Sequence, residues 1–205
     1  MSRRCLIFAG GEPEPYLPEG VVTDGALIIA ADKGYENCAA LGITPALVIG
    51  DFDSLGRVPE GAKVYPKEKD DTDLMLAVRE ALSRGCEDIT ILGAMGGRFD
   101  HTFANVQVLD FILSEGGVGR ITSVREAVTL LPAGEYAFPK REGWSLSLFA
   151  YSRMVTGLTL RGVKYTLEYG EITRYFPIGV SNEITSDSGE VSFKTGILLV
   201  CQSRL

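Results

Sequence analysis

The sequence has few of the residues that build zinc sites, redox centres or disulfide frameworks. Among its 205 residues there is a single histidine, and its four cysteines, Cys5, Cys38, Cys86 and Cys201, are too far apart to form a close metal-binding or dithiol pair. No stretch approaches the roughly 20 apolar residues that a membrane helix needs. The apolar run near the start is interrupted by acidic and proline residues before it reaches signal-peptide length. We therefore expect a cytoplasmic protein with reduced thiols and no membrane partner.

Positive charge is also in short supply. The 20 Lys and Arg stand against 27 Asp and Glu, which gives a formal net charge of -7. Because a surface of this sign repels polyanions, we expect no nucleic-acid partner and favour small-molecule ligands. The apolar content of 45% is ordinary for a globular protein with a real core.

The first part of the chain alternates short apolar runs with helical patterns. Buried strands are predicted at CLIFAGG, ALIIAAD, ALVIGDFDS and ITILGAMGG, and helices at about 72–84 and 101–114. This alternation is typical of a parallel, Rossmann-like α/β sheet. In the second helix, the residues expected to face the core are Phe103, Val106, Leu109 and Leu113.

After about residue 124 the pattern changes to short β-rich segments spaced by glycines. These segments are TLLPAGEYAF, WSLSLFAY, TGLTLRG, KYTLEYG and GILLVCQ. They predict an all-β sandwich or jelly-roll. We therefore expect an α/β domain over residues 1–123, followed by a β-sandwich domain over residues 124–205.

Aspartates fall where the predicted strands meet the helices. Asp51 and Asp53 follow ALVIG, Asp70 and Asp73 open the helix near residue 72, and Asp100 follows ITILG. The carboxyl ends of parallel strands share one edge of the sheet, so these residues are expected to converge on one crevice. Crowded carboxylates repel one another unless a cation compensates, and hard oxygen ligands select Mg²⁺ or Mn²⁺. The sequence thus predicts a divalent metal site.

Positively charged side chains occur in the same connections. Arg98 lies in MGGRFDH, where its guanidinium fork and the paired glycines suit phosphate oxygens. The single histidine, His101, directly follows Asp100. Lys67 precedes the first helix; for Lys69 we prefer a solvated surface charge. For Asp71 we prefer simple charge complementarity at a helix start. These parts indicate metal-assisted phosphoryl chemistry but do not name a substrate.

Ordered motifs across the chain carry a resemblance. ADKG, LGITPALVIGDFDSLG, KEKDDTDLMLAV and GAMGGRFDHTFANVQVL resemble the catalytic domain of bacterial thiamine pyrophosphokinases. The tail, with TGLTLRGVKYTLEYGEI, GVSNEI and GILLV, is similar to the thiamine-binding β domain of that family. The resemblance implies transfer of the β,γ-pyrophosphoryl group of ATP to thiamine, giving thiamine diphosphate and AMP. It also implies Mg²⁺ as cofactor and a homodimer with its site between the subunits.

The same resemblance implies roles for individual residues. The catalytic residues would be Asp51, Asp53, Asp73, Arg98, Asp100 and His101, and the metal ligands Asp51, Asp53, Asp70 and Asp73. The nucleotide-binding residues would be Asp32, Ser54, Lys67, Asp70, Thr72 and Arg98. Ser181 and Asn182 match the thiamine-contacting motif, and Tyr165 is a candidate aromatic neighbour of the thiazolium.

The sequence departs from the family pattern at one point, and other functions remain open. The familiar ADGG appears as ADKG, with Lys33 in place of glycine, which bears on the role of Asp32. A pterin-type pyrophosphokinase, a metal-dependent phosphohydrolase and a non-catalytic nucleotide-binding regulator are the alternatives. The tail with GVSNE favours thiamine pyrophosphokinase over the pterin-type enzyme.

Overall fold

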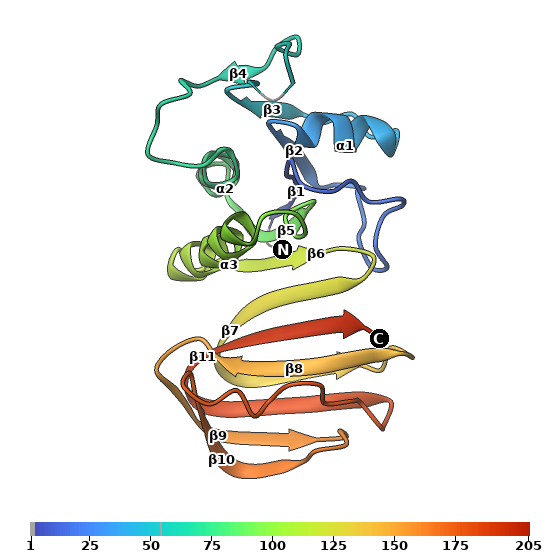
Figure 1. Cartoon of the computed structure of the whole chain (residues 1–205), viewed down its shortest axis with the longest axis vertical. Coiled ribbons are helices and arrows are strands. Elements are labelled where there is room, and N and C mark those ends of the chain that lie inside the picture. Colours follow the sequence, from blue (N-terminus) through green and yellow to red (C-terminus); the bar gives the residue numbers. More distant parts are fainter. Residues whose placement is uncertain (1–2, 54) are drawn as a thin grey trace. The chain divides into compact units, whose positions relative to one another are not determined.

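The chain divides into two compact units, Met1–Val124 and Arg125–Leu205. The computed structural model describes residues 3–53 and 55–205 (Figure 1). None of the described helices is long and apolar enough to cross a bilayer.

The first unit is a parallel sheet covered by helices. Its strands are β1 (Arg3–Phe8), β2 (Leu27–Ala31), β3 (Leu47–Gly50), β4 (Lys63–Val64), β5 (Cys86–Leu92) and β6 (Val118–Thr122). They lie in the order β6-β5-β1-β2-β3-β4, and every pair along this row is parallel. Helix α1 (Gly34–Ala40) lies on one side of the sheet, and α2 (Asp73–Ser83) and α3 (Phe99–Ser114) lie on the other (Figure 1). The predicted parallel α/β sheet is confirmed.

The buried strands and the capped helix explain this arrangement. Because helices cover both faces, the central strands β1, β2 and β5 end in continuous buried runs rather than alternating, and Ile7, Ile29 and Ile89 are fully buried. Helix α2 begins where the Thr72 hydroxyl accepts a hydrogen bond from the backbone N–H of Met75, at 3.1 Å. It packs on the sheet through Leu74, Ala77, Val78 and Ala81, as its sequence periodicity predicts.

Helix α3 differs from the prediction at its beginning. It starts at Phe99, and its buried residues are Val108, Leu109 and Ile112. Phe103 is 54% exposed, so the prediction that it faces the core is wrong. The reason is that α3 packs through its second half, while the first turns leave the Phe103 ring beside that of Phe99, with the centroids 6.2 Å apart.

The second unit is antiparallel throughout its strand pairs. Its strands are β7 (Glu126–Pro139), β8 (Trp144–Ala150), β9 (Met154–Arg161), β10 (Leu167–Thr173) and β11 (Ser188–Arg204). The long strand β11 pairs with β7 over most of its length, with a register break between Phe193 and Ile197. On its other edge, the first part of β11 pairs with β9 as far as Thr195, and the part from Leu198 onward pairs with β8. At the break, Gly196 has a φ of 97°.

Strands β9 and β8 thus flank different parts of β11, and the buried apolar side chains of this unit, Leu148, Val155 and Leu198 among them, form one core. The prediction that the chain ends in a β-rich part is confirmed, and its strand pairs are antiparallel.

Candidate active site

The loops that follow the carboxyl ends of the central strands β1 and β5 are in close contact. The strand order reverses around β1, with β2 on one side and β5 on the other, and such a switch point is where open α/β sheets form a ligand crevice. The backbone N–H of Gly11 donates to the carbonyl oxygen of Gly93 at 2.8 Å. The buried Asn37 amide donates to the carbonyl oxygen of Ala9, also at 2.8 Å. The loops after β1 and β5 are thus tied to each other and to α1.

The structure accounts for the departure from the family pattern in ADKG. A Cβ atom at Gly34 would lie 1.8 Å from the carbonyl oxygen of Phe8, so only glycine fits there. Lys33 has a helical backbone with φ of −59° and an exposed side chain, so a lysine costs no backbone strain. A lysine beside Asp32 is therefore compatible with the backbone of this turn.

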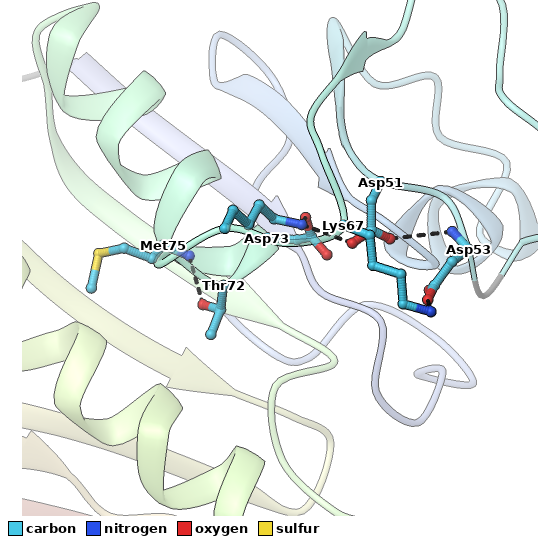
Figure 2. Close-up of polar contacts among 7 residues, drawn as sticks. Asp51, Asp53, Lys67, Thr72, Asp73 and Met75 are labelled. Carbon is cyan, nitrogen blue, oxygen red and sulfur yellow. Dashed lines mark hydrogen bonds and ion pairs between the residues drawn. The ribbon is translucent and has the colours of Figure 1, made fainter.

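Three carboxylates from three connections lie together at this edge. Asp32 follows β2, Asp51 follows β3 and Asp73 is the first residue of α2. One oxygen from each lies within 4.8 Å of the others, and all three residues are partly buried. Figure 2 shows the carboxylates of Asp51 and Asp73 turned toward one another. We call Asp32, Asp51 and Asp73 the carboxylate cluster.

A buried phenylalanine holds the loop that carries Asp51. Phe52 is 3% exposed and belongs to the apolar core of the first unit. Its φ of 59° is unusual for a bulky residue and marks local strain. With its ring anchored in the core, the flanking Asp51 and Asp53 stay at the edge of the sheet, where the backbone N–H of Asp53 donates to Asp51 Oδ1 at 3.2 Å.

Two lysines pair with the aspartates on either side of Phe52. Lys69 Nζ lies 2.7 Å from Asp51 Oδ2 and 3.1 Å from Asp73 Oδ1, and its side chain is only 13% exposed. The expectation that Lys69 is a solvated surface charge is wrong, because its ammonium pairs with the carboxylates of Asp51 and Asp73 and is largely shielded from solvent. Lys67 Nζ lies 2.6 Å from Asp53 Oδ2 (Figure 2), but there the two side chains are 75% and 46% exposed.

The shared ammonium affects the two carboxyl groups differently. The hydrogen bond from Lys69 holds the pKa of Asp51 below its usual value. Burial raises the pKa of Asp73, and Lys69 offsets this only in part. Burial disfavours the charged form of Lys69, but its hydrogen bonds to Asp51 and Asp73 outweigh this, and its pKa is raised. The cluster thus depends on a cation for its charge balance.

Other residues expected at the metal and nucleotide sites lie apart from the cluster. Among the described residues, the group that could share one ion contains Asp32, for which we predicted nucleotide binding, and leaves out the exposed Asp53 and Asp70. The Thr72 side chain caps α2. Ser54 lies outside the described residues.

Asp71, which we interpreted as structural, lies away from the cluster. Its Oδ2 pairs with Arg79 Nε at 2.9 Å on the surface.

Arg98 and Asp100 form an exposed pair at the start of α3. Arg98 Nε and Nη2 donate to the two carboxylate oxygens of Asp100, at 3.1 and 2.5 Å. This pairing lowers the pKa of Asp100. The backbone N–H of His101 also donates to Asp100, at 2.9 Å, and the His101 side chain is exposed. All three residues lie at the carboxyl end of β5, the edge of the sheet that also carries the cluster.

The predicted thiamine-binding residues lie together in the second unit. Asn182 is 5% exposed, and its side-chain oxygen accepts hydrogen bonds from the backbone N–H groups of Tyr165 and Glu183, both at 2.9 Å. Its Nδ2 donates to the carbonyl oxygen of Tyr165, also at 2.9 Å. Ser181 is exposed, with φ of 58°, and the Tyr165 side chain is exposed as well. Asn182 therefore fixes the backbone that presents the other two.

A parallel α/β sheet that gathers carboxylates and cations at its carboxyl edge has the features of a metal-dependent phosphoryl-transfer enzyme. The comparisons with known proteins name the family. The family model "Thiamin pyrophosphokinase, catalytic domain" matches residues 20–115, and "Thiamin pyrophosphokinase, vitamin B1 binding domain" matches residues 135–198. The thiamine pyrophosphokinase of Bacillus subtilis is 35% identical over 96% of this chain and 97% of its own length.

Solved structures agree with these matches. The crystal structure of the Bacillus subtilis thiamine pyrophosphokinase superposes with a TM-score of 0.89 at 33% identity, covering 99% of this chain and 100% of the other. The thiamin pyrophosphokinase from Geobacillus thermodenitrificans gives a TM-score of 0.85 at 29% identity, with 98% of each chain covered. The chain belongs to the thiamine pyrophosphokinase family, as its sequence motifs predicted.

Proposed function

We propose that this chain transfers the pyrophosphoryl group of ATP to the hydroxyl of thiamine, giving thiamine diphosphate and AMP. The observation that carries the proposal is the match of both domain models and of a curated thiamine pyrophosphokinase along nearly the whole chain. In this reaction the hydroxyl oxygen of thiamine bonds to the β-phosphorus, the bond from that phosphorus to the bridging α,β-oxygen breaks, and the hydroxyl proton is released. No finding favours the pterin-type, phosphohydrolase or regulator alternatives.

Asp32, Asp51 and Asp73 are the residues we infer to hold the divalent metal. Three carboxylates within 4.8 Å are an all-oxygen donor set, which suits Mg²⁺ better than zinc. When bound, the metal would neutralise charge on the phosphate oxygens. This assignment replaces Asp53 and Asp70 with Asp32 in the inner set. It leaves the exposed Lys67 ammonium available to the phosphates.

Arg98 is the residue we infer to bind the triphosphate. Its guanidinium is exposed and engaged only at the surface by Asp100, so phosphate oxygens can take the place of that carboxylate. Without nucleotide, Asp100 orients Arg98, and this pairing lowers the pKa of Asp100. Phosphates that take the place of the carboxylate would remove that cause, so Asp100 and His101 both stay predicted catalytic residues.

Ser181 and Tyr165 are the residues we infer to contact thiamine, on a backbone held by Asn182.

The homodimer implied by the family resemblance is also part of the proposal. Exposed apolar side chains support it, since Tyr169, Tyr175 and Phe176 are each at least 66% exposed, and a second copy of the chain could cover them. Sedimentation would test this, and a monomer at micromolar concentration would contradict it. The cytoplasmic location stays a prediction.

Release of AMP from ATP, measured with and without thiamine, tests the proposed function. We expect release only when thiamine is present. Asp51→Asn should lower turnover by about a hundredfold or more, since it removes charge from the metal site. Asp71→Asn is the matched control, because it removes the same charge two residues from Asp73, at a carboxylate that lies outside the cluster and pairs with Arg79 on the surface.

Two results would contradict the proposal in different ways. AMP release that does not depend on thiamine would refute thiamine as the acceptor. Equal turnover of the Asp51→Asn and Asp71→Asn variants would refute the metal assignment. Thermal unfolding of both variants should accompany the assay, so that a loss of fold is not mistaken for a loss of chemistry.

A further inference from the structure

A lysine, Lys69, contacts two of the three members of the carboxylate cluster. Lys69 Nζ contacts Asp51 at 2.7 Å and Asp73 at 3.1 Å, and its side chain is 13% exposed. These two aspartates are also members of the group whose oxygens lie close enough together to share one ion. The ammonium therefore uses the same carboxylates that a divalent cation would need.

We propose that Lys69 is a resident counter-ion of the carboxylate cluster. It holds the metal-free cluster together and competes with a divalent cation until the phosphates of the nucleotide draw its ammonium away. This inference rests on the proposed metal site and adds a form of regulation to it. Metal and nucleotide should bind cooperatively, because each favours the displacement of the same ammonium.

Charge counting shows why competition is expected. The three carboxylates of the cluster carry three negative charges when ionised, and Lys69 leaves a net charge of −2. One divalent ion would balance that charge, but with Lys69 in place it would lie beside an ammonium of like sign. The side chains are only 13% to 22% exposed, so solvent and salt screen this repulsion weakly. Phosphate oxygens offer the ammonium an alternative set of acceptors.

The chain supplies its own matched control at Lys67. Lys67 is two residues away on the same segment, carries the same charge and also pairs with an aspartate, Asp53, at 2.6 Å. Those two side chains are 75% and 46% exposed, and Asp53 lies outside the cluster. Removing the charge of Lys67 should therefore change metal binding only through weak, screened effects.

The test is a titration of Lys69→Gln, Lys67→Gln and the parent with Mn²⁺, with free Mn²⁺ followed by electron paramagnetic resonance. Without nucleotide, Lys69→Gln should bind Mn²⁺ about tenfold more tightly than the parent, and Lys67→Gln within about threefold. The titration is repeated with an ATP analogue that has a methylene bridge between the α- and β-phosphorus atoms. The analogue should tighten Mn²⁺ binding to the parent and have a smaller effect on Lys69→Gln.

The metal-free proteins give a second measurement. In chelator, Lys69→Gln should unfold at a lower temperature than Lys67→Gln, since only the first variant leaves partly buried carboxylates without their ammonium. Lys69→Arg keeps a cation and should keep both the weak Mn²⁺ binding and the thermal stability of the parent. It provides the comparison if Lys69→Gln does not fold, and tighter Mn²⁺ binding by Lys69→Arg would contradict the proposal.

The outcomes separate this inference from the proposed metal site. If Lys69→Gln binds Mn²⁺ like the parent, or if both glutamine variants tighten binding equally, Lys69 is not a competing counter-ion, and the metal site still stands. If the Asp51→Asn variant binds Mn²⁺ as tightly as the parent does, the metal does not bind at the cluster, and both proposals are overturned.

Discussion

Replacing Asn182 with alanine should destabilise the second unit of the chain. The Asn182 side chain is buried and makes three hydrogen bonds, each 2.9 Å long, to the backbone of Tyr165 and Glu183. The variant removes all three and leaves one carbonyl and two N–H groups without these partners. The backbone hydrogen bonds between residue 182 and Leu146 do not depend on the side chain and should remain.

The expected loss follows from the number of hydrogen bonds. Each contributes about 1 kcal/mol net, so the free energy of unfolding should fall by roughly 2–3 kcal/mol. For a chain of this size, 1 kcal/mol corresponds to about 2–4 °C, so the midpoint of thermal unfolding should fall by roughly 4–12 °C. Thiamine binding should weaken as a consequence, because the backbone that presents Tyr165 becomes less ordered, and ATP binding should be unchanged.

Urea unfolding followed by tryptophan fluorescence measures this loss where it occurs. Trp144 is the only tryptophan, and it lies at the start of β8 in the second unit. Ser181→Ala is the control, because it shortens an exposed neighbour and should change stability by no more than about 0.5 kcal/mol. If Asn182→Ala unfolds at the urea midpoint of the parent and yet loses thiamine binding, the amide contacts thiamine directly, and the structural role argued above is refuted.

Four further changes test other parts of the structure. Ser181→Gly should relieve the strain of a positive φ and stabilise the fold by up to about 1 kcal/mol, while raising the KM for thiamine; lower stability would contradict this. Gly34→Ala should cost more than about 3 kcal/mol in urea unfolding, because its methyl group would lie 1.8 Å from a carbonyl oxygen, and parent-like stability would disprove the close packing. Arg98→Lys should raise the KM for ATP and slow AMP release at unchanged thermal stability, and parent-like kinetics would make Arg98 a surface residue. Burial raises the pKa of Cys38 to about 12, so mass spectrometry should find this thiol alkylated only in unfolded protein.

Much of the first unit could be predicted because its strands are buried on both faces. An all-apolar run such as ALIIAA has few alternatives when aspartate and glycine follow it. Leu74, Ala77 and Ala81 recur with the helical period, which marks α2. Phe103 could not be placed in the same way. Helix α3 carries apolar residues on more than one side, so the sequence does not tell which of them pack on the sheet.

The site was predicted less completely than the fold. The end of a predicted strand pointed to Asp51, and the start of a predicted helix pointed to Asp73. An aspartate directly after a buried strand also marks Asp32 as a possible cluster member. The position of Lys69 was missed because its partner Asp51 is 18 residues away, and the distance between their two loops depends on the packing of the sheet. The structural role of Asn182 was missed for the same reason, since Tyr165 lies 17 residues earlier.

The strained backbone positions link stability to function in this chain. Among the described residues, the non-glycine residues with positive φ are Asp32, Phe52, Tyr169 and Ser181, and such conformations cost of order 1–3 kcal/mol each. Glycine would remove that cost at any of them. At Asp32 it would also remove a carboxylate of the cluster, at Phe52 the ring that anchors the loop of Asp51, and at Ser181 the hydroxyl next to Asn182. The strain is therefore concentrated where a particular side chain is needed, and the carboxylate cluster and the Ser181 turn gain their geometry at the expense of stability.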